Sequence, residues 1–435
     1  MTGLRRRTLL GAGVLAGAGA VLTGCTSDSP AGAPAFHSQD WESVRAQFTV
    51  DPALAHFNAF VLSPHPAPVR KAVQTHRDGL DSGYEYHPAG LPDRDMADAT
   101  SRMVAARFLG ATYDQVVLTD STTMGLGLLY GGLKLLPGQD VLTTEHDFLS
   151  THEGLRLLSA RTGAKIRRVR LYDDPAKAAQ ADIVSRITKA LGPRTRIVAI
   201  TWVHSSTGVR LPVRAIADAL ATANKTRPEQ DRALLCVDGV HGFGAIAEGV
   251  TDLGCDFLAS GTHKWLFGPR GTGFLYGRSL DQLTTTIPSF STEAYQGFIT
   301  GTTPSSAGGN LVGPGGYKAY EHRWALPEAY GFIQAIGPAR IQKRAQELAT
   351  TLKKGLAAIP GVQVHTPLDP ALSAGLVCCT ITGLGPEEAV RRLRADHAIA
   401  ASTTPYRESY LRFGTSMVVS PDQVEAAIKA VRAIA

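Results

Sequence analysis

Five short polar segments hold most of the side chains in this sequence that can transfer protons, bond covalently or bind anions. Each follows directly on a short apolar run, and the five are Asp120–Met124, Glu145–Asp147, His204–Gly208, Asp238–His241 and Gly261–Trp265. In open α/β sheets, ligands bind outside the carboxyl ends of the strands. The pattern therefore predicts one ligand site assembled from five strand ends. These histidines lack metal-ligand spacing such as H-E-x-x-H, so we expect no metal in the site.

The apolar runs before these segments predict the strands that must position them. Strands are predicted at 115–118, 140–144, 195–203, 233–237 and 256–260, with helices such as 213–224 between them. Strands that alternate with helices form βαβ units around a mainly parallel sheet. The fold class is therefore predicted to be α/β.

After residue 324 the pattern changes to that of a second, smaller domain. A long helical region is predicted at 326–356, short strands at 376–381 and 399–402, and a last helix at 421–434. This mixture is typical of an α+β unit packed on the first domain. We therefore assign residues 40–322 to an N-terminal arm with the large domain, and 323–435 to a small C-terminal domain.

The segments around Asp238 and Lys264 resemble a known family. Val237–Gly242 and Ser260–Tyr276 are similar to motifs of the fold-type-I pyridoxal phosphate (PLP) enzymes, more closely of their class-V aminotransferase branch. That branch includes isopenicillin N epimerase-like proteins and cysteine desulfurases, and the resemblance runs from about residue 56 to the C-terminus. It implies a PLP-dependent enzyme with a mainly parallel seven-stranded sheet and a smaller C-terminal domain. It also implies a homodimer with active sites between the subunits.

The chemistry of PLP explains why a lysine and an aspartate follow two of the strands. PLP needs a lysine amine to hold it covalently, and Lys264 is the candidate. PLP withdraws electrons only while its pyridine nitrogen stays protonated, which requires a carboxylate such as that of Asp238. Asp238 ends an otherwise apolar run, where a charge has little structural purpose. Lys264 and Asp238 are therefore predicted to be catalytic.

The phosphate of PLP needs N–H and hydroxyl donors at a helix N-terminus. Thr122 and Thr123 open a predicted helix and supply such a place. The resemblance implies that His263 reaches the same phosphate.

The resemblance also implies which residues surround the PLP ring. His146 matches the position where an imidazole stacks on the ring, and it is counted among the catalytic residues. His241 matches the position beside the ring hydroxyl. His204 or Ser205 matches a further contact to that oxygen, and the sequence does not choose between the two.

Two arginines are predicted to bind anionic groups. In the family, an arginine near the C-terminus binds the substrate carboxylate, and Arg412 stands at the matching place. Its planar guanidinium suits a bidentate carboxylate contact. In the family, a Gly-Thr pair from the partner subunit often completes the phosphate site. The matching stretch here, Tyr320–Trp324, lacks that pair, and Arg323 is the candidate instead.

The predicted reaction is chemistry at Cα of an amino acid, or of an amino group carried by a peptide. Cysteine desulfurases place a nucleophilic Cys on a loop shortly before the substrate arginine, and residues 401–410 contain none. Cys378 and Cys379 lie on an earlier apolar run that is typical of a core strand. Epimerisation, transamination, elimination and oxidative routes stay open. The alternatives are a cysteine desulfurase or lyase, or a non-catalytic ligand-binding lipoprotein on the same fold.

Residues 1–24 predict export. Arg6-Arg7 fits a twin-arginine signal, and the mild apolar stretch after it falls short of the ~20 apolar residues of a spanning helix. The stretch ends in Leu22–Cys25, which resembles a bacterial lipoprotein box. We therefore expect lipidation at Cys25, a flexible tether at 25–39, and a place at the extracytoplasmic face or in the periplasm. An uncleaved anchor is the alternative. An exported enzyme of this kind is suited to tailor a secreted natural product.

Composition narrows the possible partners. Of 435 residues, 44% are apolar and 19% charged, which is ordinary for a globular protein and excludes disorder, collagen and coiled coil as overall descriptions. The net charge is +6, and three of the surplus charges are Arg5, Arg6 and Arg7. That surplus is too small to indicate nucleic acid. The expected partners are an amino-acid or peptide substrate, a second copy of the chain, and the membrane only through the lipid.

Overall fold

In a computed structural model, the fold is described for residues 34–82, 94–304 and 308–435, and residues 34–435 form one compact unit. The predicted signal, Cys25 and the first part of the predicted tether lie outside the described residues. The described part of that tether, 34–39, contacts the fold: Phe36 packs against Phe332 at 5.0 Å between ring centroids, and Gln47 Nε2 donates to Pro34 O at 3.0 Å. Within the described residues, no helix combines the length and apolarity needed to span a membrane.

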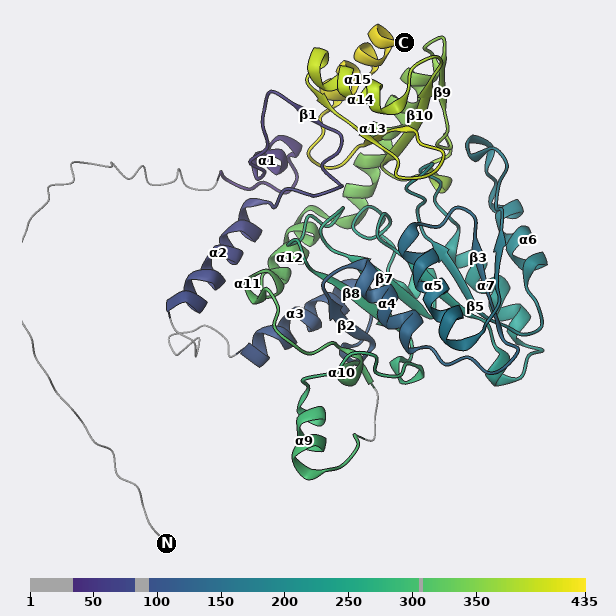
Figure 1. The fold of residues 1–435 in the computed structure, drawn as a ribbon. Coiled ribbons are helices and arrows are strands. Elements are labelled where there is room, and N and C mark those ends of the chain that lie inside the picture. Colours follow the sequence, from purple (N-terminus) through teal and green to yellow (C-terminus); the bar gives the residue numbers. More distant parts are fainter. Residues whose placement is uncertain (1–33, 83–93, 305–307) are drawn as a thin grey trace, which may run out of the picture. The chain divides into compact units, whose positions relative to one another are not determined.

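The central sheet has seven strands in the order β2-β8-β7-β6-β5-β3-β4 (Figure 1). The strands are β2 Val116–Thr119, β3 Asp140–Thr144, β4 Ile166–Val169, β5 Thr195–Thr201, β6 Leu234–Asp238, β7 Phe257–Gly261 and β8 Gly273–Gly277. β8 pairs antiparallel with both neighbours and every other pair is parallel. The predicted mainly parallel, seven-stranded α/β architecture is thereby confirmed.

Side chains along each strand alternate between two cores, one on each face of the sheet. In β6, Leu234 and Cys236 pack with helices α4 (Thr122–Gly132) and α5 (Leu149–Thr162). Leu235 and Val237 pack in the other core, with α6 (Gln180–Ala190), α7 (Val213–Asn224) and α12 (Leu326–Ile336). Because successive side chains of a strand point to opposite faces, a strand buried on both sides reads as a continuous apolar run.

Further helices lie before, between and after these strands along the chain. They are α1 Trp41–Ala46, α2 Ala67–Ser82, α3 Arg94–Leu109, α6 Gln180–Ala190, α7 Val213–Asn224, α8 Val250–Leu253, α9 Thr292–Thr300, α10 Gly308–Val312 and α11 Tyr320–Arg323. The predicted helix at 213–224 is confirmed as α7.

The C-terminal part carries a four-stranded antiparallel sheet in the order β12-β13-β10-β9. Its strands are β9 Val362–Val364, β10 Leu376–Ile381, β12 Ser402–Thr403 and β13 Leu411–Gly414, and its helices include α14 Pro386–His397 and α15 Pro421–Ile434. The helical region predicted at 326–356 is confirmed, but a break at Gly337 divides it into two helices, α12 Leu326–Ile336 and α13 Pro338–Ala357. Gly337 adopts φ 97° at the break, a conformation that favours glycine, and Pro338 starts the second helix.

The N-terminal arm joins the C-terminal part through a short pairing. β1 (Ala55–His56) pairs in parallel with β11 (Ile399–Ala400). The strand predicted at 399–402 is therefore two short strands, β11 and β12, in different sheets. Phe57 packs edge-on against Phe413 at 5.5 Å between ring centroids. The arm thus reaches the strand that carries Arg412.

Candidate active site

Lys264 lies in the turn after β7 and faces a buried histidine. Its Nζ is 3.1 Å from His241 Nε2, and His241 Nδ1 accepts a hydrogen bond from Trp265 Nε1 at 3.2 Å. Trp265 stacks on Phe60 at 5.2 Å, which fixes the indole that holds the imidazole. The Gly-Thr-His-Lys-Trp segment therefore positions its own lysine through the residue that follows it.

These contacts assign the protons between Lys264 and His241. Burial lowers the pKa of His241 well below its ordinary value, so the imidazole is neutral and carries one proton. Trp265 Nε1 can only donate, so that proton lies on Nε2 of His241 and points at Lys264 Nζ. A neutral amine accepts such a bond, whereas an ammonium does not. Burial also lowers the pKa of Lys264 to about 8, which favours the neutral, nucleophilic form.

Asp238 ends β6 with its side chain 1% exposed. Its Oδ1 accepts from Val240 N at 3.1 Å, while Oδ2 has no hydrogen-bond partner within the described residues. Burial raises the pKa of Asp238 to about 6. The hydrogen bond from Val240 and the charge of Lys264 act in the opposite direction and lower this pKa, but burial has the larger effect. A cationic N–H beside Oδ2 would satisfy this oxygen and restore the ionised form.

The predicted phosphate residues meet at the start of α4. Thr122 Oγ1 accepts from Gly261 N at 2.7 Å, so the helix start is tied to the end of β7. A Cβ on Gly261 would lie 2.8 Å from His263 Cε1 and 3.4 Å from Thr122 Oγ1, so only a glycine lets these two side chains share the space. His263 Nδ1 has no partner in the described structure, and Thr123 is exposed.

His146 is held by a tyrosine that the sequence did not indicate. Its ring stacks on Tyr172 at 3.9 Å and 16°, and its Nε2 accepts from Leu171 N at 3.1 Å. Burial lowers the pKa of His146 to about 4, so the ring is neutral. Tyr172 also contacts His204: its hydroxyl lies 2.8 Å from His204 Nδ1. One tyrosine therefore orients both imidazoles.

Arg412 lies on β13 with 6% of its surface exposed. Its Nη1 donates to Ser205 O and its Nε to Ser402 Oγ, both at 3.2 Å, and its guanidinium lies 5.1 Å from the centre of the Phe60 ring. Both acceptors are neutral oxygen atoms. Ser205 Oγ in turn lies 2.8 Å from the hydroxyl of Tyr406. A buried guanidinium held only by neutral groups is suited to receive a carboxylate.

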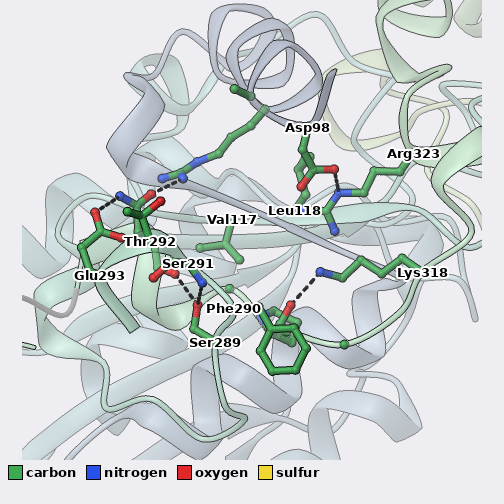
Figure 2. A pocket seen from close by; sticks show the side chains of 18 of the residues that line it. Asp98, Val117, Leu118, Ser289, Phe290, Ser291, Thr292, Glu293, Lys318 and Arg323 are labelled. Carbon is green, nitrogen blue, oxygen red and sulfur yellow. Dashed lines mark hydrogen bonds and ion pairs between the residues drawn. The ribbon is translucent and has the colours of Figure 1, made fainter. Parts of the chain in front are cut away.

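Arg323 stands apart from this cluster. Its Nε pairs with Asp98 Oδ1 at 2.8 Å, and it lines a cavity of about 340 Å³ together with Arg102 and Lys318 (Figure 2). Of the predicted site residues, only Arg323 lines this cavity. The structure thus brings together Lys264, Asp238, His241 and the other predicted cofactor residues of one chain. Arg323 was predicted to complete the phosphate site of a partner subunit, and that role stays a prediction.

The cysteines in the described part of the chain are not activated as nucleophiles, although Cys378 lies directly opposite Arg412 across β10 and β13. Cys236, Cys255, Cys378 and Cys379 are buried and unpaired. Burial raises the pKa of all four thiols above their ordinary value. A nucleophilic thiol needs the opposite shift and partial exposure.

The residues at the strand ends fit PLP. The buried polar atoms that lack a hydrogen-bond partner within the described residues include Asp238 Oδ2, His204 Nε2 and His263 Nδ1. These are the side chains predicted to meet the ring nitrogen, the ring oxygen and the phosphate. The Lys264 amine, whose pKa burial lowers to about 8, lies near them, as a covalent link to the cofactor requires.

Comparison with known proteins supports the same class. The chain matches the class-V aminotransferase family over residues 95–405. An isopenicillin N epimerase of Streptomyces clavuligerus is 28% identical over 355 residues, which cover 78% of this chain and 83% of that protein. A probable cysteine desulfurase of Mycolicibacterium paratuberculosis is 28% identical over 363 residues, covering 77% of this chain and 48% of that protein. A solved structure of a C-DES mutant with glycine covalently linked to its PLP cofactor superposes with a TM-score of 0.79 at 22% identity, covering 89% of this chain and 98% of that one.

The fold and the cluster around Lys264 define an enzyme of PLP fold type I. The chain belongs to the class-V aminotransferase family, and its cofactor is PLP.

Proposed function

We propose that this enzyme acts at Cα of an amino acid, or of an amino group carried on a peptide, in the manner of an isopenicillin N epimerase. The observation that carries the proposal is the buried Arg412 guanidinium, which neutral oxygens hold close enough to act electrostatically on the amine of Lys264. A substrate carboxylate on Arg412 brings its Cα toward Lys264 Nζ. The absence of Cys from residues 401–410 disfavours the usual desulfurase route.

Each residue then has a separate task. Bound PLP supplies an electron sink for the charge that develops at Cα. Asp238 Oδ2 holds a proton at the pyridine nitrogen, and Thr122 and His263 hold the phosphate. Once its amine is free, Lys264 Nζ takes the proton from Cα as general base. The stacked pair of His146 and Tyr172 would offer the cofactor ring a flat partner.

The test is a screen of purified holoenzyme in D₂O with L- and D-amino acids and short peptides that carry a free α-amino acid end. Exchange of the Cα proton is read by NMR and inversion by chiral chromatography. We expect at least one compound to exchange, Lys264→Ala to abolish exchange, and Arg412→Ala to raise KM more than tenfold. Arg394→Ala, an exposed site on α14, is the matched control. Sulfide or persulfide release from cysteine, with no exchange from other compounds, would favour the desulfurase alternative.

We also propose that the enzyme is exported and anchored by lipid on Cys25, where it tailors a secreted natural product. The support is the Arg6-Arg7 pair, the mild apolar stretch, and the Leu22–Cys25 box. Cell fractionation tests it. Cys25→Ser should release the protein from membranes, and changing Arg6-Arg7 to Lys-Lys should retain it in the cytoplasm. A Cys25→Ser protein that stays in the membrane fraction would indicate an uncleaved anchor instead.

We further propose that the chain works as a homodimer. The support, besides the family, is helix α9, where Phe298 and Ile299 are 85% and 75% exposed. Exposed apolar side chains in a cluster indicate a contact surface. Sedimentation should show a dimer, and Phe298→Ser with Ile299→Ser should shift it toward monomer. A protein that sediments as a monomer at micromolar concentration would refute the proposal.

A further inference from the structure

Tyr406 lies beside the residues of the candidate active site but has no role in the proposed chemistry so far. It lies in the turn between β12 and β13, three residues after the end of β12. Its hydroxyl is 2.8 Å from Ser205 Oγ, and its ring packs edge-on against Phe148 at 5.8 Å. Phe148 follows His146 by two residues. Tyr406 therefore reaches from the C-terminal sheet to the ends of β3 and β5.

The hydroxyl of Tyr406 shares its neighbour with the substrate-binding arginine. Ser205 offers Oγ to Tyr406 and its carbonyl to Arg412 Nη1. Lys264 comes from a different direction, in the turn after β7, where it faces His241. Arg412 is close enough to interact electrostatically with both Lys264 and Tyr406. An amino acid held through its carboxylate by Arg412 would therefore lie near Lys264 Nζ and Tyr406 Oη, two groups that can exchange protons.

Inversion at Cα needs such a pair. A proton must leave one face of the carbon and another must arrive on the opposite face. A single lysine that returns its own proton to the same face restores the starting enantiomer. Burial raises the pKa of Tyr406 well above its ordinary value, so its hydroxyl is protonated and able to donate.

We propose that Tyr406 is the second acid–base residue of this enzyme, delivering a proton to the face of Cα opposite Lys264. One C–H bond breaks as Lys264 Nζ takes the proton, and one forms as Tyr406 Oη gives its own. The electron pair left by the first proton is the pair that binds the second. Lys264 then releases a proton to water and Tyr406 recovers one from water. This inference rests on the proposed function and specifies how that site inverts a centre.

The matched pair of variants is Tyr406→Phe and Tyr410→Phe. Both remove one hydroxyl from the same turn, but Tyr410 stacks on His365 instead of facing Ser205. The holoenzyme is incubated in D₂O with an L-substrate from the screen. Deuterium in recovered L-substrate measures proton removal and return by Lys264, and D-product measures inversion. We expect Tyr406→Phe to keep exchange within threefold of wild type and to lose inversion at least 100-fold, within the usual range for one acid–base group. Tyr410→Phe should change neither.

A binding measurement separates this role from a structural one. An α-methyl amino acid has no Cα proton, so its affinity, read from the visible absorption of the bound cofactor, reports only the fit of the site. Tyr406→Phe should bind it within twofold of wild type, because the ring that packs on Phe148 is kept. Equal loss of exchange and inversion, or weaker analogue binding, would make Tyr406 structural and overturn the proposal.

The failures of the two proposals are also distinguishable. A wild-type enzyme that exchanges the Cα proton but inverts no substrate keeps the proposed Cα chemistry and overturns the role of Tyr406. Inversion at the wild-type rate by the Tyr406→Phe enzyme also overturns the role of Tyr406 and keeps the proposed Cα chemistry. A wild-type enzyme that neither exchanges nor inverts any compound overturns both.

Discussion

Replacing Lys264 with methionine should stabilise the cofactor-free protein at neutral pH. Burial lowers the pKa of Lys264 from 10.5 to about 8, so the folded chain holds this proton more weakly than the unfolded chain does. At pH 7 the folded protein must keep a charged amine where charge is penalised. Methionine is an unbranched side chain of similar length that carries no charge. The stabilisation should therefore depend on pH.

The sign and size follow from proton linkage. When the pKa of an amine is lower in the folded protein than in the unfolded protein, the free energy of unfolding is reduced. This reduction is complete at pH values below the folded-state pKa, and it disappears as the pH rises above the unfolded-state pKa. A pKa lowered from 10.5 to about 8 costs about 3 kcal/mol at pH 7 and about 1.5 kcal/mol at pH 9.5. Loss of the contact between Nζ and His241 removes about 1 kcal/mol at pH 9.5, where the amine is mostly neutral and can accept the bond, and nothing at pH 7, where an ammonium cannot accept it. The variant should thus be more stable by about 3 kcal/mol at pH 7 and by about 0.5 kcal/mol at pH 9.5.

Urea unfolding of both cofactor-free proteins at the two pH values measures this difference. Lys318 and Lys353, whose pKa burial also lowers to about 8, are present in both proteins and cancel in the comparison. Lys343→Met is the control, because that side chain is 79% exposed on α13 and should show no pH-dependent gain. A difference between Lys264→Met and wild type that stays constant from pH 7 to pH 9.5 would refute the reasoning.

Three further changes have defined outcomes. Asp238→Asn should lower the pKa of Lys264 below about 8, since this carboxylate is the charge that opposes the effect of burial; the pH dependence of amine modification in the cofactor-free protein measures it. Tyr172→Leu should weaken PLP binding about three- to tenfold, as read by equilibrium dialysis, because the stack on His146 is lost. Gly414→Ala should cost about 1–3 kcal/mol in urea unfolding, because its Cβ would lie 2.2 Å from a phenylalanine ring carbon.

The elements that sequence predicted well are those with strong local signals. The last helix, 421–434, has Pro421 at its first position and Ser420 in a capping box, and it begins and ends where predicted. The buried parallel strands read as plain apolar runs. β8, Gly273–Gly277, was not predicted as a separate strand because two of its five residues are glycines. The break at Gly337 was missed because apolar periodicity continues on both sides of it.

The site was predictable only as far as chemistry marks its residues. Lys264 and Asp238 stand out because an amine and a carboxylate follow apolar strands. Tyr172 and Phe60 have no such signal, since their roles come from stacking on residues distant in sequence. Tyr406 carried one usable hint, because it lies in the loop where a desulfurase would place its cysteine.

The charges of the site explain why so many histidines are gathered there. Burial holds the imidazoles of His146, His204 and His241 neutral, lowers the pKa of Lys264, and raises that of Asp238. A neutral imidazole can accept one hydrogen bond and donate another, so it can orient a ligand without adding charge. Charge then enters with the ligands, a pyridinium toward Asp238 and a carboxylate toward Arg412. The positive pyridinium pairs with the Asp238 carboxylate, and the negative carboxylate pairs with the Arg412 guanidinium. The buried site can therefore select both the cofactor and the amino-acid end of its substrate.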